Sequence, residues 1–302
     1  MIKRTILVEN KSAMSVKNNQ LVIKSEIRES SLPIEDIGFL VLDNQEIYIS
    51  LPAMNLLIEN NTAVIICGKN HLPNGMFLNL NSHHIQQEIF RNQIEASMPL
   101  KKQLWQQTIV EKIQNQGELL TKISQNKNSF AFLASRVLSG DTSNMEGVAA
   151  QQYWKTFFDT YDINFKRERF GNYPNNFLNY GYAILRAATA RALSGSGLLN
   201  TLGIHHKSKY NAFALADDIM EPFRPLVDEK VFDIMQRHDE QELNTKIKAE
   251  LLEILTQTVY FEDEKSPLMV ALQKTASSLQ QCFMGSRKKI KYPKLWNLTA
   301  TE

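Results

Sequence analysis

Two histidines and three carboxylates lie within one short stretch of the sequence, and these residue types bind divalent metal ions. Asp218 and Asp217 are three and four positions before Glu221, so a helix would place the three carboxylates on one face. Like charges on one face repel unless a cation screens them, and folding alone does not need such an arrangement. His205 and His206 come shortly before this helix, where one of them can meet the acids. The pattern favours metal binding over the plainer alternative, an acidic helix face in water.

The helix that positions these acids is predicted by its apolar residues. They recur at helical spacing: Phe213, Ala216, Met220 and Phe223. That spacing sets one side of the helix against a core, so we expect the acids to face a cleft or solvent. Pro222 lacks a backbone donor and disfavours helical geometry before it, so the helix should kink or end beside Glu221.

Glu146 is a further candidate acid, earlier in the chain. Ser143 or Asn144 can cap a helix there, which places Glu146 in the first turn, where the helix dipole keeps a carboxylate ionised. The alternative is that Glu146 serves only as a capping residue. The residues alone do not decide between these two roles.

Basic residues form two groups that suit phosphates. The first group is interleaved with aromatic residues and continues onto the following helix, whereas the second lies near the end of the chain. Cations beside aromatic rings suit phosphates and unpaired bases, although an ordinary loop and a solvated tail are the plainer alternatives. The residues are Lys166, Arg167, Arg169 and Arg186 in the first group and Arg287, Lys288 and Lys289 in the second.

Composition and length indicate a globular protein. The 302 residues are 43% hydrophobic, enough for a sizeable core, and the formal net charge is only +2, so any affinity for nucleic acid must come from local patches. The two cysteines provide neither a disulfide framework nor a zinc pattern, which fits a reducing cytoplasm. The sequence shows no signal peptide and no apolar run long enough for a membrane helix. We expect a cytoplasmic protein.

The order of hydrophobic patterns predicts an α+β protein. Residues 1–80 alternate as short strands, which we expect to form a small antiparallel β domain with a helix at 51–58, a buried strand at 63–67 and a turn at 72–75. In residues 81–302 the apolar residues recur at helical spacing, which predicts a larger, all-helical catalytic domain. Its helices are expected at 86–96, 99–117, 131–138, 147–159, 177–194 and 212–221, and in pieces over 229–284.

The motifs, taken together in chain order, resemble those of the CRISPR-associated spacer-acquisition integrases, the Cas one family. Glu146 lies in a Met-Glu-Gly-x-x-Ala context, His205 in Leu-Gly-Ile-His-His, and Asp218-Ile-Met-Glu221 is followed by Pro-Phe-Arg-Pro. The resemblance covers nearly the whole chain. The sequence LADDIMEPFRPLVD looks most like that of members from type II systems. It implies a metal-dependent DNA endonuclease and integrase that inserts spacers into a CRISPR array when a 3′-hydroxyl attacks a phosphodiester of the repeat.

The resemblance also implies roles for individual residues. Glu146, His205 and Glu221 would be ligands of Mg²⁺ or Mn²⁺, Asp218 would be an accessory catalytic acid, and Arg224 would join the basic groups in holding DNA. Many members have Asp where Glu221 stands, an exchange that keeps the carboxylate.

The partners implied by the resemblance are double-stranded DNA, a second copy of the chain, and the small ferredoxin-like protein Cas two in a heterohexamer. A type II effector nuclease and an accessory adaptation protein belong to the same implied set. No membrane is implied, and the location is the cytoplasm of a prokaryote.

Two other functions fit parts of the sequence. The Asp-Asp-x-x-Glu signature also occurs in isoprenoid synthases, but those enzymes need a second metal motif on a facing helix and have no place for a β domain. A DNA-binding scaffold with purely structural acids is the non-enzymatic alternative. It predicts DNA binding that depends on neither metal nor Glu146.

Overall fold

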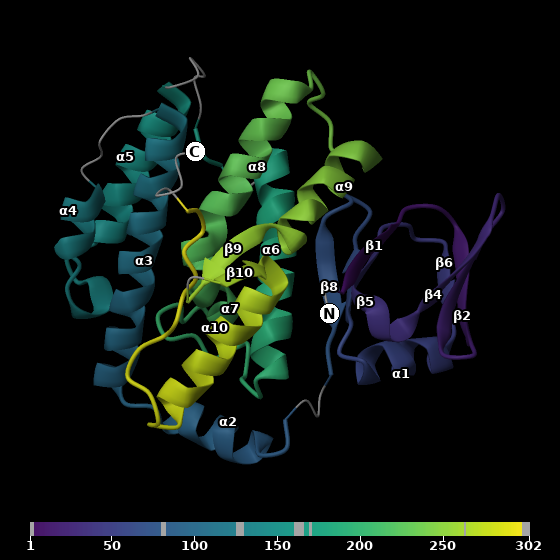
Figure 1. Ribbon diagram of the computed structural model, residues 1–302, viewed down its shortest axis with the longest axis horizontal. Helices are drawn as coiled ribbons and strands as arrows, with labels where there is room; N and C mark the ends of the chain where they lie inside the picture. Colours follow the sequence, from purple (N-terminus) through teal and green to yellow (C-terminus); the bar gives the residue numbers. More distant parts are fainter. Residues whose placement is uncertain are drawn as a thin grey trace.

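The chain folds into a β-rich part followed by a mostly helical part (Figure 1). The computed structural model describes residues 3–79, 83–124, 130–159, 166–168, 171–262 and 264–297. The expected domain boundary near Asn81 lies outside these residues, so the division into 1–80 and 81–302 stays a prediction. None of the described helices is long and apolar enough to cross a membrane.

Two four-stranded sheets and one helix make up the β-rich part. The first sheet has the order β1-β5-β7-β8 and the second has the order β4-β3-β2-β6. The strands are β1 (Arg4–Val8), β2 (Ser12–Lys17), β3 (Gln20–Ser25), β4 (Glu29–Pro33), β5 (Ile37–Leu42), β6 (Ile47–Ile49), β7 (Ala63–Cys67) and β8 (Pro73–Phe77), and α1 is Leu51–Glu59.

The expected antiparallel sheet is only partly correct, because three strand pairs are parallel: β1 with β5, β5 with β7, and β2 with β6. All six residues of β5 are buried, as is usual for a central parallel strand covered on both faces. The expected turn at 72–75 is instead the start of β8, since the chain has already reversed at Gly68–Leu72, where His71 adopts a positive φ of 61°.

Helices dominate the second part, as the helical spacing of its apolar residues predicts. The exception is a hairpin of β9 (Thr258–Phe261) and β10 (Glu264–Pro267), so the expectation of an all-helical domain is corrected there. Its Thr-Val-Tyr-Phe strand is rich in β-branched and aromatic residues, which favour strands. The helices are α2 (Gln86–Glu95), α3 (Met98–Ser124), α4 (Phe130–Ser135), α5 (Met145–Asp159), α6 (Asn175–Gly195), α7 (Ala214–Met220), α8 (Arg224–Arg237), α9 (Thr245–Leu252) and α10 (Leu268–Phe283).

The buried helix α6 lies at the centre of this part and packs against α7, α8, α9 and α10. Gly181 permits its close approach to α8, since a Cβ atom there would lie 2.5 Å from Cγ1 of Val227. One face of the first sheet joins the same core through Phe39 and Val41, whereas its other face packs toward the second sheet. The β-rich and helical parts therefore share apolar packing.

A buried ion pair also joins the two parts. Nζ of Lys248 in α9 lies 2.6 Å from Oδ2 of Asp43 and 3.1 Å from Oε1 of Glu9. We expect Lys248→Met to lower the free energy of unfolding by about 3 kcal/mol, because Asp43 would stay buried without its main counter-charge. Urea unfolding measures the change. Lys230→Met, which breaks a pair with the exposed Glu253, is the matched control and should cost under about 1 kcal/mol. Equal costs would contradict this.

Glu111 on α3 predicts a pH-dependent stability. Burial, with a smaller contribution from Glu118, raises the pKa of Glu111 from 4.5 to about 7. The folded state therefore favours the protonated acid, and this stabilisation is present below pH 4.5 and lost as the pH rises through 7. We expect Glu111→Gln to raise the free energy of unfolding by about 2 kcal/mol at pH 8 and by under about 1 kcal/mol at pH 5. Urea unfolding at both pH values measures this, and an equal gain at both would contradict it.

Candidate active site

Glu146 is held at the start of α5 by the loop before it. The carboxylate of Asp141 accepts the backbone N–H groups of Met145 and Glu146, at 2.8 and 3.0 Å. The cap is thus Asp141 rather than the expected Ser143 or Asn144, because positive φ angles at Gly140 and Asp141 turn the chain back. Glu146 lies in the first turn, as predicted.

Glu221 is held where α7 ends. The α-helix stops at Met220, and a 3₁₀ turn over Glu221–Phe223 leads into α8, so Pro222 ends the regular helix as its chemistry predicts. The side chain of Asn115 supports the turn, since its Nδ2 donates a hydrogen bond to the Pro222 carbonyl at 2.8 Å. Glu221 is only 3% exposed, so of the two expected settings, a cleft or solvent, open solvent is excluded for this carboxylate.

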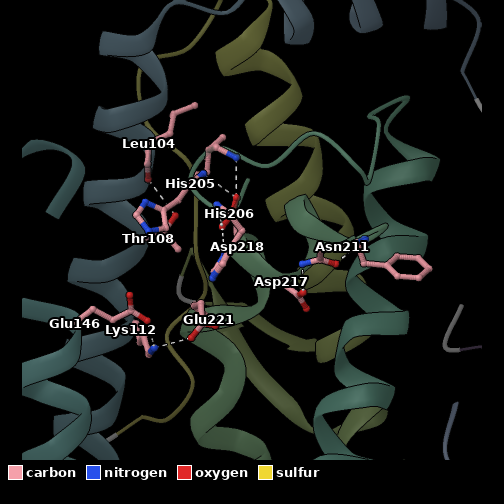
Figure 2. A network of polar contacts seen from close by, with 12 residues as sticks. Leu104, Thr108, Lys112, Glu146, His205, His206, Asn211, Asp217, Asp218 and Glu221 are labelled. Carbon is pink, nitrogen blue, oxygen red and sulfur yellow. Dashed lines mark hydrogen bonds and ion pairs between the residues drawn. The ribbon is translucent and has the colours of Figure 1, made fainter. Parts of the chain in front are cut away.

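Lys112 of α3 joins these two carboxylates (Figure 2). Its Nζ lies 2.6 Å from Oε1 of Glu146 and 2.6 Å from Oε2 of Glu221. The contact with Glu146 is a hydrogen bond, whereas the equally short contact with Oε2 of Glu221 is an ion pair without hydrogen-bond geometry. Arg224 holds the other oxygen of Glu221, with Nη2 2.8 Å from Oε1.

The charges in this cluster support one another. Burial would raise the pKa of Glu221, but Arg224 and Lys112 outweigh it and the pKa is lowered. Burial likewise would lower the pKa of Lys112, but Glu221 and Glu146 outweigh it and the pKa is raised. The pKa shifts of Glu221 and Lys112 therefore both favour the charged form of the group at neutral pH.

Asp218 is fully buried and holds residues 204–206, the histidine loop, in place. Its carboxylate accepts the backbone N–H groups of Ile204, His205 and His206, at 2.6, 3.0 and 3.2 Å. Nδ1 of His206 lies 2.6 Å from Oδ1, and this hydrogen bond raises the pKa of His206. Gly203 allows the tight fit, since a Cβ there would lie 2.7 Å from Oδ2 of Asp218. Both oxygens of Asp218 are thus used in positioning the loop.

The neighbouring Asp217 points to different partners. Nδ2 of Asn211 donates to Oδ2 of Asp217 at 2.8 Å, and Nε of Arg186 lies 3.4 Å from Oδ1. Figure 2 shows Asp217 beside Asn211 and directed away from Glu146 and Lys112. The three acids of the motif do not form one shared face, so the Asp-Asp-x-x-Glu arrangement of an isoprenoid synthase is absent.

His205 stacks on Trp105 of α3, with ring centroids 4.1 Å apart and an interplanar angle of 4°. The histidine that meets an acid is His206, through Asp218. Within the described ranges, no three His, Cys, Asp or Glu residues are grouped closely enough to hold a metal ion. The structure brings Glu146 and Glu221 together, and the assignment of His205 as the third ligand stays a prediction.

The predicted DNA-binding residues differ in their availability. Arg224 pairs with Glu221, and Arg167 donates to Asn175 and Asn179 at 2.8 and 2.7 Å, so both have protein partners here and their contact with DNA stays a prediction. Arg186 pairs with Asp217. Arg169 lies outside the described residues. The exposed members of the set are Lys166, Lys288 and Lys289.

A groove of about 620 Å³ opens beside His206. Its lining includes Lys101, Lys207, Lys209 and the exposed Tyr210, and no carboxylate is among the lining residues. Nζ of Lys209 lies 5.0 Å from the centroid of the Tyr210 ring. The groove thus offers positive charge and an aromatic surface next to the histidine loop.

Sequence reasoning missed Lys112, Trp105 and Asp141. Lys112 is a single basic residue in a long helix, and only its position against α5 and the turn after α7 reveals its contacts. The Gly140-Asp141 pair was the one available signal, because this dipeptide favours a turn that can cap the following helix.

Comparison with known proteins places this geometry in a family. The model of the family described as CRISPR associated protein Cas1 matches residues 5–259. The CRISPR-associated endonuclease Cas1 of Neisseria meningitidis is 35% identical over 299 residues, which cover 98% of this chain and 97% of that protein.

Two solved structures share the fold at lower identity. A casposase bound to its integration product has a TM-score of 0.80 and 20% identity, covering 100% of this chain and 96% of its own. A chain of a Cas6–RT–Cas1–Cas2 complex has a TM-score of 0.74 and 19% identity, covering 98% of this chain and 36% of its own. With the family match over most of its length and the close relative over nearly all of it, this chain belongs to the Cas1 family of CRISPR-associated proteins.

Proposed function

We propose that this chain is a metal-dependent DNA endonuclease and integrase of CRISPR adaptation, which inserts short DNA fragments into a CRISPR array. The 3′-hydroxyl of a fragment attacks a phosphodiester of the repeat. A new P–O bond forms as the bond to the leaving 3′-oxygen breaks, and the proton of the attacking hydroxyl passes to solvent while the leaving oxygen takes one up. The number of phosphodiester bonds is unchanged.

The observation that carries this proposal is the meeting of Glu146 and Glu221 around a cation. They come from α5 and from the turn after α7, elements far apart in the sequence, and one Nζ contacts an oxygen of each. Two convergent carboxylates beside a histidine loop are the donor set of a phosphoryl-transfer metal site.

The residues fit a hard divalent ion. Oε2 of Glu221 is buried without a hydrogen-bond donor among the described residues, and carboxylate oxygens are the ligands that Mg²⁺ and Mn²⁺ prefer. Glu146, Glu221 and His205 would hold the ion, which when bound would polarise the phosphoryl oxygens and favour ionisation of the attacking hydroxyl. Asp218 contributes by fixing the backbone of the histidine loop.

The basic groove beside His206 suits the DNA substrate. Lys101, Lys207 and Lys209 would contact phosphates, and Tyr210 offers a ring on which an unpaired base can stack. Lys166, Lys288 and Lys289 are exposed and remain proposed phosphate contacts. Arg224, which lowers the pKa of Glu221, also remains a proposed phosphate contact.

Partners are proposed from the family and its neighbours. The Cas6–RT–Cas1–Cas2 complex supports a Cas2-type partner, and the casposase bound to its integration product supports DNA as substrate. We propose a homodimer, and a heterohexamer of two such dimers with Cas2, because inserting both ends of one fragment requires two active sites at a fixed separation. A type II effector nuclease, an accessory adaptation protein and a cytoplasmic location in a prokaryote complete the proposal.

An integration assay tests this function against the DNA-binding scaffold. The chain and its Cas2-type partner are incubated with a short duplex and a supercoiled plasmid that carries the repeat. We expect joined products with Mg²⁺ or Mn²⁺, none with EDTA, and none when the fragment ends in 2′,3′-dideoxynucleotides and so lacks the attacking hydroxyl. DNA binding should persist in all three cases. Joining in EDTA or with dideoxy ends, or binding without joining under every condition, would contradict the proposal.

A further inference from the structure

Lys112 lies at a place where a divalent ion would be expected. It is only 8% exposed, and its ammonium group is within 2.6 Å of an oxygen from each of Glu146 and Glu221. Oxygen ligands of Mg²⁺ lie about 2.0–2.1 Å from the ion, so an ion bridging these two carboxylates would occupy nearly the volume that Nζ occupies. Both cations cannot hold that position together.

We propose that Lys112 is a resident counter-cation that holds Glu146 and Glu221 together when no divalent ion is bound, and that it must leave this position for the ion to bind. This inference rests on the proposed function, because it takes both carboxylates as metal ligands. Lys112 is then a positioning residue that keeps the site assembled and also sets its affinity for metal.

The carboxylates of Glu146 and Glu221 need a cation between them. Arg224 contacts only Oε1 of Glu221, so without Lys112 the side of Glu221 that faces Glu146 would carry a buried charge with no counter-ion. Two carboxylates in that state repel and destabilise the fold. The ammonium removes this repulsion while the site awaits metal.

The ammonium group of Lys112 fits the two carboxylates imperfectly. Nζ of Lys112 donates a hydrogen bond to Glu146, but its contact with Oε2 of Glu221 is an ion pair without hydrogen-bond geometry. An ion without directional preference toward two oxygens satisfies both. The site is thus stable with Lys112 in place yet can exchange it for a divalent ion, since the ion gains the contact that the lysine makes poorly.

Equilibrium binding of Mn²⁺ alone, followed by electron paramagnetic resonance or calorimetry, tests this proposal on the full chain. Lys112→Met removes the competing cation, and we expect it to bind Mn²⁺ about tenfold more tightly than the unaltered protein or better. Lys112→Arg keeps a cation and should bind no more tightly. Lys102→Met, which removes an exposed lysine of the same helix, should leave the affinity unchanged. Unchanged or weaker binding by Lys112→Met would overturn the inference.

Thermal unfolding provides a second readout. In EDTA, Lys112→Met should melt below the unaltered protein because two carboxylates repel, and Mn²⁺ should raise its melting temperature by more than it raises that of the unaltered protein. Where Lys112→Met alone folds too poorly to study, Lys112→Gln replaces it and carries the same expectation. A Mn²⁺-induced rise no larger than that of the unaltered protein would overturn the inference.

Glu146→Gln separates this inference from the proposed function. Loss of Mn²⁺ binding in Glu146→Gln, together with an unchanged affinity in Lys112→Met, would overturn the role of Lys112 and leave the ligand assignment standing. Normal Mn²⁺ binding in Glu146→Gln would overturn the ligand assignment, and the inference with it. Loss in Glu146→Gln with a gain in Lys112→Met supports both.

Discussion

Glu146→Gln and Glu221→Gln should each lower the rate of integration at least about a hundredfold, while the fold and the binding of duplex DNA persist. Each exchange removes one negative charge from the pair that meets at Lys112, so the site no longer offers two carboxylates to a divalent ion. Rates of joining in the plasmid assay measure the effect. Melting temperatures in EDTA verify that each variant is folded.

Two further variants complete this first prediction. Glu253→Gln removes an exposed carboxylate that pairs only with Lys230, and it should integrate normally. His205→Ala should also abolish integration if its ring serves as the third ligand, as the family resemblance implies. Near-normal joining by Glu146→Gln or Glu221→Gln would show that the pair is structural, and near-normal joining by His205→Ala would remove His205 from the ligand set.

Asp218→Ala should have the second-largest effect, and chiefly through the loop it holds. The change leaves the buried N–H group of Ile204, the part-buried N–H group of His205 and the ring of His206 without their acceptor. We expect the free energy of unfolding to fall by at least about 3 kcal/mol, and integration to fall with it. Urea unfolding and hydrogen exchange at the amides of residues 204–206 measure both parts of the prediction.

Asp217→Ala is the matched control for that change, one position earlier on the same helix. Asp217 contacts Asn211 and the half-exposed Arg186, so its loss should cost under about 1 kcal/mol and leave exchange at residues 204–206 unaltered. Equal behaviour of the two variants, or slow exchange of those amides in Asp218→Ala, would contradict the positioning role.

Helices were largely predictable from the sequence because the spacing of their apolar residues involves positions only three or four residues apart. The expected helix at 86–96 forms as Gln86–Glu95, and the end beside Pro222 follows from proline chemistry. Strand pairing was less predictable, since the direction of β1 against β5 depends on where the intervening strands lie. A pattern of residues cannot carry that information unless the connection is a short hairpin, such as Asn18-Asn19 between β2 and β3.

At the site, residue types were predictable but their partners were not. Asp217 and Asp218 are adjacent in sequence, yet one faces Arg186 and the other the histidine loop, because one step along a helix turns the side chain by about 100°. Lys112 looks like any lysine on a helix until α5 and the turn after α7 are placed against it. The charges that complete the site therefore come from tertiary packing.

Replacement of a non-bridging oxygen of the attacked phosphate by sulfur tests whether Glu146 and Glu221 hold a divalent ion against that phosphate. Sulfur binds Mg²⁺ poorly and Mn²⁺ better, because Mn²⁺ is the softer ion. We expect that one phosphorothioate diastereomer of the repeat reacts slowly in Mg²⁺, that Mn²⁺ restores its rate, and that Glu146→Gln stays inactive in both ions. Equal rates for both diastereomers in Mg²⁺, or a slow diastereomer whose rate Mn²⁺ does not restore, would contradict a metal contact at this phosphate.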